Sequence, residues 1–207
     1  MKIDLRRFVV VAAIVLAPAV AAAQSAADNR ADADRLEAAL HVGTGSVVCE
    51  IGAGSGEISM LMAQAVGPSG HVYSNDLNAD RRAEIAQAAA QASLANVTVI
   101  EGAPAMSNIA AGTCDALFMR NVYHHFADPA SMNASLYQAL KPGSRIAIID
   151  FPPRGTESVD PKGRADEAHH GVSSGSVVRE LRAAGFAEVS ASSLPRGTFI
   201  VVGMRPR

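Results

Sequence analysis

A glycine-rich turn in the first third of the chain is the part of the sequence whose spacing indicates chemistry most clearly. The apolar run VVCEI leads into Gly52, Gly54 and Gly56, after which the sequence becomes helical in character. Glycines at such a turn let the backbone approach a ligand, and the free N–H groups of the helix start face that ligand. Asp76 follows Gly56 by 20 residues and ends the next apolar run. A carboxylate there can bind both hydroxyls of a ribose, so the pattern predicts a nucleoside-binding crevice.

The glycines and the acid also have plainer interpretations. Taken separately, the glycines form only a tight turn, and Asp76 is a solvated strand end. The order of strand, glycine loop, helix, strand and acid favours the crevice. A dinucleotide fingerprint would place a glycine or alanine at position 57, where this chain has Glu57. Because a carboxylate repels a pyrophosphate, the loop favours a nucleoside ligand without phosphate.

Two histidine pairs are the candidates for proton transfer. His124 and His125 follow the fourth expected strand, and His169 and His170 precede the last helix, so both pairs are expected at the same crevice. We expect His125 or His170 to act as a base, with Tyr123 as a hydrogen-bonding helper. The alternative is that these side chains pack loops or face solvent. Neither pair has a zinc-binding spacing, and adjacent residues usually point apart, so no metal site is predicted.

The elements that position these residues alternate along the chain. Apolar strand-like runs are expected at 47–51, 71–75, 97–100, 116–119 and 145–149, with helices at 57–66, 79–93 and 129–140. This alternation predicts a parallel sheet covered by helices on both faces. A helix at 177–184 is followed by strands at 186–190 and 198–202, whose short link cannot hold a crossover helix. The sequence therefore predicts an α/β, Rossmann-like, seven-stranded, mostly parallel sheet with an antiparallel C-terminal strand.

The N-terminus has the layout of a secretory signal peptide. Lys2, Arg6 and Arg7 precede an apolar run over residues 8–17, and small residues up to Ala23 follow it. The apolar run is too short to cross about 30 Å of hydrocarbon, so no stable membrane span is expected after cleavage near Ala23. We therefore expect an exported, periplasmic protein.

The rest of the chain is expected to form one domain. Residues 24–45 should form a helix and linker, including a surface helix over 28–40, and residues 46–207 the catalytic domain. The net charge of −2 offers no electrostatic footprint for nucleic acid. The segment 152–164 is rich in proline, glycine and charged residues. It is expected to be either a mobile cap over the bound substrate or a plain surface linker.

The two cysteines fall on or beside neighbouring strands. Cys49 lies within one expected strand, and Cys114 lies just before another. If the strands are aligned at their motif-bearing ends, Cys114 is several residues behind Cys49, beyond the separation of about 7 Å that a disulfide tolerates. The sequence therefore predicts two free, mostly buried thiols.

The motifs resemble those of class I S-adenosylmethionine-dependent methyltransferases. The segment EIGAGSG at 50–56 resembles the first motif of that family, and DALFMRN at 115–121 resembles its fourth. Asp76 falls on the ribose-binding acid of the family, and the reversed last strand is also typical of it. The resemblance covers roughly residues 45–203.

The resemblance implies S-adenosylmethionine as cofactor. The residues that it implies for binding are Glu50, Gly52, Ala53, Gly54, Gly56, Asp76, Leu77, Gly102, Ala103 and Asn121. The chain departs from the family at Ala103, where an acid often holds the adenine amino group. Adenine would then be held by backbone groups or by Glu101.

The methyl acceptor is expected to be a small molecule. The family members that methylate amino groups or nucleobases often carry an Asn-Pro-Pro-aromatic loop, and residues 121–124 read NVYH instead. The sequence therefore favours an oxygen or carbon acceptor, with no nucleic-acid partner, and predicts no oligomeric state. Because a periplasm has no evident supply of the cofactor, an exported binding module without catalysis is the alternative. A nicotinamide-dependent oxidoreductase is a weaker one.

Overall fold

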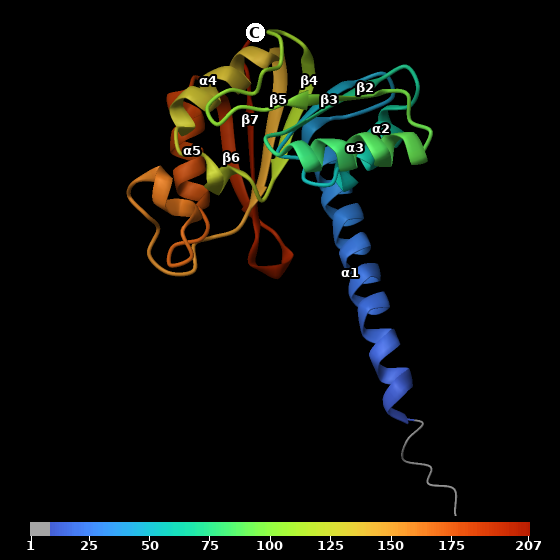
Figure 1. The fold of residues 1–207 in the computed structure, drawn as a ribbon. Helices are drawn as coiled ribbons and strands as arrows, with labels where there is room; N and C mark the ends of the chain where they lie inside the picture. The colour runs from blue at the N-terminus through green and yellow to red at the C-terminus, as the bar shows by residue number, and fades with distance from the viewer. Residues whose placement is uncertain (1–8) are drawn as a thin grey trace, which may run out of the picture.

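A single mixed sheet organises the chain. The computed structural model describes residues 9–207, with side chains from residue 25 onward, so the predicted signal peptide lies outside the part whose side chains are described. In the described part, seven strands form one sheet in the order β3-β2-β1-β4-β5-β7-β6 (Figure 1). The strands are β1 (Val47–Ile51), β2 (His71–Asp76), β3 (Val97–Glu101), β4 (Cys114–Arg120), β5 (Leu140–Asp150), β6 (Ala187–Ser193) and β7 (Phe199–Met204). The helices are α1 (Val9–Leu40), α2 (Glu57–Val66), α3 (Ala79–Gln91), α4 (Pro129–Ala139) and α5 (Ser174–Ala183).

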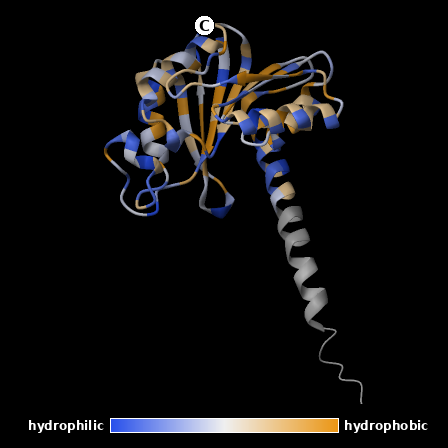
Figure 2. Cartoon of the chain, viewed as in Figure 1, coloured by the Kyte–Doolittle hydropathy of each residue, from blue (hydrophilic) through white to orange (hydrophobic). Residues whose placement is uncertain are grey.

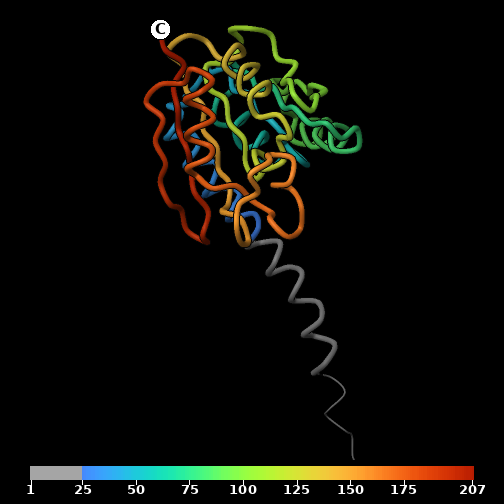
Figure 3. The backbone as a smooth tube through the Cα atoms, turned by 90° about the vertical axis from the view of Figure 1, so that its left-hand side faces the viewer, coloured from blue at the N-terminus to red at the C-terminus, as the bar shows by residue number. Residues whose placement is uncertain are grey.

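The strand directions confirm the predicted architecture. The pairings among β1 to β5 are parallel, whereas β7 is antiparallel to both β5 and β6. The link between β6 and β7 holds only a 3₁₀ turn, Pro195–Gly197, because it is too short for a crossover helix. In Figure 3 the red β6–β7 pair lies at one side of the fold and the teal α3 at the other. The chain order reverses between β1 and β4, which is where open α/β sheets bind ligands.

Helices cover both faces of the sheet. The C-terminal part of α1 packs with α2 over one face, where Leu36, Met62 and Phe118 are fully buried. On the other face α4 and α5 pack over Leu117, Ile148 and other apolar side chains of the strands. Figure 2 shows the apolar strands between the more polar helix surfaces. Two apolar layers therefore hold the carboxyl ends of the central strands in place.

The N-terminal helix is longer than the sequence predicts. The expected surface helix over 28–40 is the end of α1, and Ala33, Leu36 and Leu40 on one side of it are buried. Among the residues that the structure describes, no helix is long and apolar enough to cross a membrane.

Helix α2 begins differently from the other helices of the domain. Asn78 caps α3, Asp128 caps α4 and Ser173 caps α5, each by accepting hydrogen bonds from backbone N–H groups. Helix α2 starts after Gly56, in the left-handed region at φ 86°, without a side-chain cap. Its amino end therefore keeps the N–H groups that a ligand can use.

The prediction of two free thiols is wrong. Cys49 and Cys114 form a disulfide, and their Cα atoms lie 5.9 Å apart. The ladder pairs Cys49 with Leu117, as a regular alignment would. However, the pairing of β4 with β5 shifts register between Cys114 and Ala116, and Leu140 already pairs with Cys114. This irregularity places Cys114 on the same buried face as Cys49, which the alignment of regular strands did not anticipate.

Candidate active site

A cavity of about 410 Å³ lies at the carboxyl ends of β1, β2 and β4. Residues predicted from the sequence line much of it: Gly52, Gly54, Asp76, Leu77, Ala103, Asn121 and His125. A second hollow of about 280 Å³ shares the glycine loop and adds Glu50 and Ala53. Gly56 and Gly102 line neither hollow. The structure therefore gathers most of the predicted cofactor residues around one continuous region.

The glycine loop leaves room for a ligand at one position. Gly54 has a φ of 59°, and a Cβ added there would meet no atom within 4 Å. By contrast, a Cβ on Gly52 would come within 2.5 Å of Val122, on the loop after β4. The two loops thus touch at Gly52 and leave the space beside Gly54 open, as a bound nucleoside requires.

Asp76 connects the glycine loop to the second strand. Its Oδ2 accepts the N–H of Gly54 at 2.9 Å, and its Oδ1 accepts the N–H of Asn78 at 2.9 Å. Each carboxylate oxygen has a further lone pair, so both can still accept a ribose hydroxyl. The carboxylate is therefore held in place by the backbone while it faces the cavity.

The next residues form an apolar slot beside Asp76. Leu77 is 58% exposed, although it lines the cavity together with Ala103 and Pro104. An exposed leucine at this place offers an apolar surface that a flat adenine ring could bury. Glu101 instead forms an ion pair with Arg82 at 3.3 Å and does not line the cavity. Of the two ways to hold adenine left open by the sequence, the geometry gives no support to the one that uses Glu101.

Gly102 supports this slot from behind. A Cβ on Gly102 would lie 2.7 Å from Oδ1 of Asn75, a buried side chain that lines the cavity. The Nδ2 of Asn75 donates to the carbonyl of Ser107 at 2.7 Å. The contribution of Gly102 is therefore close packing against Asn75.

Glu50 is a buried acid next to the second hollow. Burial raises the pKa of its carboxyl to about 8, although a hydrogen bond from Ser59 and the charge of Arg120 act in the opposite direction. Glu50 is only 3% exposed and still contributes to the lining of the hollow. A carboxyl in this state is neutral at pH 7 and becomes charged when a cation comes close. This region therefore suits a positively charged group of a ligand.

The loop after β4 forms the opposite wall of the cavity. His125 lines it with Val122, Phe126 and Met132, so one imidazole lies among apolar side chains. Burial of part of the ring, followed by the charges of His124 and His170, lowers the pKa of His125. The ring centroids of His125 and His170 lie 6.2 Å apart. The structure thus brings the two predicted bases together, but only His125 reaches the cavity.

Tyr123 lies in the interior and not at the cavity. Its hydroxyl donates to Glu180 at 2.9 Å and accepts from Asn133 at 2.7 Å. Burial, followed by the charge of Glu180, raises its pKa. Glu180 also pairs with the buried Arg164 at 2.6 Å. This geometry gives no support to the expected role of Tyr123 at the reacting centre and assigns its hydroxyl to the packing of α5.

The segment 152–164 is anchored at its far end. Arg164 is 4% exposed and binds Glu180 on α5 and, at 3.4 Å, Glu157 within the segment. No pattern in the sequence predicts this anchor, because charged residues in such a stretch usually face solvent.

Sequence reasoning also missed several residues of the cavity wall. Asn75, Arg81 and Met132 line it, and none of them belongs to a recognised motif. Asn75 directly precedes Asp76 in the same strand, which is the signal that was available for it. Arg81 lies in the first turn of α3 and borders both hollows.

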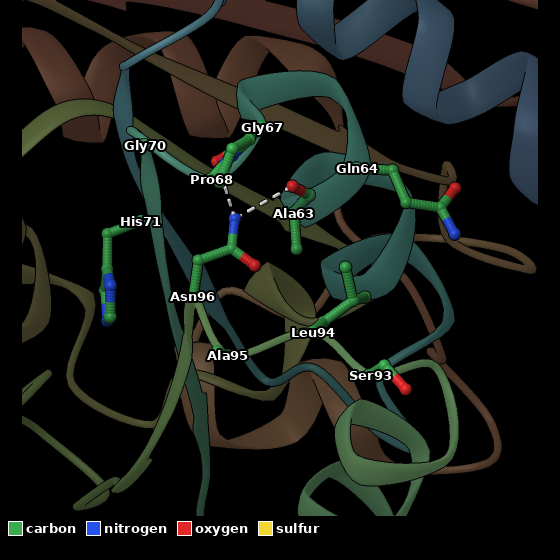
Figure 4. A pocket seen from close by; sticks show the side chains of 10 residues that line it. All are labelled: Ala63, Gln64, Gly67, Pro68, Gly70, His71, Ser93, Leu94, Ala95 and Asn96. Atoms are coloured by element: carbon green, nitrogen blue, oxygen red, sulfur yellow. Dashed lines mark hydrogen bonds between the residues drawn. The ribbon is translucent and has the colours of Figure 1, made fainter.

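Another hollow, of about 470 Å³, lies at the opposite end of the strands. It is found where β2 and β3 begin, and the Nδ2 of Asn96 donates to the carbonyls of Ala63 and Gly67 there (Figure 4). Of the chemical groups singled out from the sequence, none lines it. We therefore place the candidate site at the carboxyl ends of the strands.

Comparisons with known proteins find similarity to methyltransferases. Residues 49–148 match the family described as a methyltransferase domain. The chain is 26% identical over 111 residues to a demethylmenaquinone methyltransferase of Listeria monocytogenes, covering 54% of this chain and 47% of the relative. It is 25% identical over 118 residues to a ubiquinone/menaquinone biosynthesis C-methyltransferase of Legionella pneumophila, covering 54% of this chain and 45% of that protein. The chain thus spans about half the length of these relatives.

A solved structure extends the similarity to the fold. The crystal structure of a SAM-dependent methyltransferase from Aquifex aeolicus aligns with a TM-score of 0.72 at 22% identity, covering 84% of this chain and 89% of that one. At this identity the similarity is one of fold. Residues 49–148 thus form a methyltransferase domain, and the chain has the fold of the class I S-adenosylmethionine-dependent methyltransferases.

Proposed function

We propose that the protein transfers the methyl group of S-adenosylmethionine to an oxygen or carbon atom of a small molecule outside the cytoplasm. The observation that carries this proposal is the single cavity that joins Asp76 and Leu77, on the cofactor side, to His125 and Phe126, on the far wall. A cofactor whose ribose binds Asp76 would have its sulfonium end between the glycine loop and the loop after β4.

The far wall suggests the chemistry of the acceptor. Val122, Phe126 and Met132 give it an apolar surface, and His125 is its ionisable group. Methyl transfer is an in-line displacement, so the protein must align the acceptor and remove a proton from a hydroxyl or an acidic carbon. An apolar ring that carries a hydroxyl meets both requirements. The relatives with quinone names are consistent with such an acceptor.

Transfer of a labelled methyl group tests this proposal. The full chain would be incubated with S-adenosylmethionine labelled in the methyl group and with a panel of hydroquinones, phenols and primary amines. We expect label in the hydroxylated rings and none in the amines. Methylated amines would contradict the proposed acceptor class. Cofactor binding without any transfer would favour the binding module.

The disulfide supports the proposed export. Cys49 and Cys114 are both fully buried and bonded to each other, and structural disulfides persist mainly in oxidising compartments. The basic and apolar pattern of residues 1–23 indicates the same route. Fractionation of cells that express the full chain would test it, with thiol alkylation before and after reduction. Recovery in the cytoplasm with two reactive thiols would contradict export.

A further inference from the structure

Three histidines from two separate loops meet beside the cofactor cavity. His124 and His125 belong to the 3₁₀ helix Tyr123–His125, and His170 lies before α5. One ring nitrogen from each lies within 4.8 Å of the others. The ring centroid of His124 is 4.0 Å from that of His125 and 4.9 Å from that of His170. The fold has therefore placed three imidazole side chains, of the kind that bind transition metals, around one point.

Asp150 fixes the orientation of His124. The Nδ1 of His124 lies 2.9 Å from Oδ1 of Asp150, which is fully buried at the end of β5. The same carboxylate accepts the backbone N–H groups of His124 and Phe151. Since a carboxylate accepts hydrogen bonds, Nδ1 is the nitrogen that donates to Asp150, and Nε2 is the nitrogen left for another partner. A carboxylate behind a histidine is the usual support of a metal ligand.

The remaining nitrogen of His124 lacks a partner. Its Nε2 is buried without a hydrogen bond to any described residue, and the side chain is 2% exposed. A buried polar atom left unpaired costs about 1–3 kcal/mol, so a fold that keeps one usually has a use for it. A metal ion would give Nε2 of His124 a partner and would bind a ring nitrogen of His125 and of His170 as well.

We propose that His124, His125 and His170 bind a divalent transition-metal ion of the zinc class. This proposal replaces the expectation from sequence that the histidine pairs hold no metal. Three imidazoles without a thiolate favour Zn²⁺, Co²⁺ or Ni²⁺ over Mg²⁺ and Ca²⁺, which prefer oxygen ligands. Zinc–nitrogen bonds of about 2.0–2.1 Å require the nitrogens to move closer than 4.8 Å. His125 is exposed and His170 is in a loop, so both can make this movement.

The position of His125 would place the bound metal beside the cofactor cavity. Because His125 also lines the cavity, a metal that it binds lies at the edge of the acceptor wall. Three protein ligands leave a coordination position for water or a substrate oxygen. Metal binding itself does not depend on methyl transfer and can be tested without cofactor or acceptor.

Cobalt titration of the metal-free full chain tests the proposal. We expect one Co²⁺ per chain, with the visible absorption of a nitrogen-ligated, low-symmetry site, and its displacement by Zn²⁺. His170→Ala and His125→Ala should each weaken binding at least tenfold, and Asp150→Asn by about 10- to 100-fold. His169→Ala is the matched control, because that neighbour bonds the carbonyl of Thr156 and lies outside the cluster.

The results of the cobalt titration either support or overturn the metal site. Retained binding in His169→Ala with loss in His170→Ala, while circular dichroism shows both variants folded, supports the site. Absence of stoichiometric Co²⁺ and Zn²⁺ binding to the folded parent overturns it, as does equal loss in both variants. Neither result decides whether the chain transfers methyl groups, which the labelled-methyl experiment measures separately.

Discussion

Reduction of the Cys49–Cys114 disulfide should destabilise the protein by an amount that the chain separation sets. The two cysteines are 65 residues apart in the sequence. In the loop-entropy description, closing a loop of that length raises the free energy of the unfolded chain by about 4 kcal/mol, because it removes conformational entropy. Because both residues are fully buried in the native sheet, the reductant should be equilibrated with the protein in denaturant and not under native conditions.

The assay is a pair of urea unfolding curves, with and without reductant. We expect the free energy of unfolding to fall by about 4 kcal/mol on reduction. The double variant Cys49→Ala/Cys114→Ala is the control, and reductant should leave its curve unchanged. If the parent unfolds at the same urea concentration in both conditions, no disulfide stabilises the fold. The disulfide would then no longer support the proposed export of the protein.

Three further predictions concern the site. Because the pKa of Glu50 is raised from 4.5 to about 8 in the folded protein, the free energy of unfolding should fall as the pH rises through that range, by up to about 1.4 kcal/mol per pH unit. Glu50→Gln should remove this fall in unfolding curves taken across the same range. Gly54→Val should weaken cofactor binding in titration calorimetry by more than tenfold, because its side chain would enter the open space of the loop; unchanged affinity would contradict this placement. His125→Ala should lower the methyl-transfer rate by about 10²- to 10⁴-fold with cofactor affinity nearly unchanged, and an equal loss of affinity would assign His125 to structure.

Much of the fold could be predicted because its signals are local. The alternation of apolar runs with helical stretches located each strand of the sheet, and the short link at Pro195–Gly197 predicted the reversed β7. The glycine loop and Asp76 could also be recognised from their spacing along the chain. These features depend on neighbouring residues, so one sequence is sufficient to find them.

The features that were missed depend on contacts between distant segments. The disulfide required an irregular pairing near Cys114, which no periodicity reveals. The histidine cluster required Asp150 to turn His124 toward a loop that lies more than 40 residues further along the chain. Tyr123 is a predicted helper of the site, but it lies in a 3₁₀ helix with His124 and His125, where neighbouring side chains point in different directions. Tertiary placement, not residue type, decides such roles.

The central claim is that the cavity beside Asp76 binds S-adenosylmethionine. Titration calorimetry of the full chain with S-adenosylmethionine, S-adenosylhomocysteine and NAD tests it most directly, with Asp76→Ala as the matched variant. We predict one site per chain for the first two ligands, no heat with NAD, and a loss of about 1.5–3 kcal/mol, or roughly ten- to hundredfold in affinity, in Asp76→Ala. Silence with both adenosyl ligands, or parental affinity in a folded Asp76→Ala variant, would contradict the account.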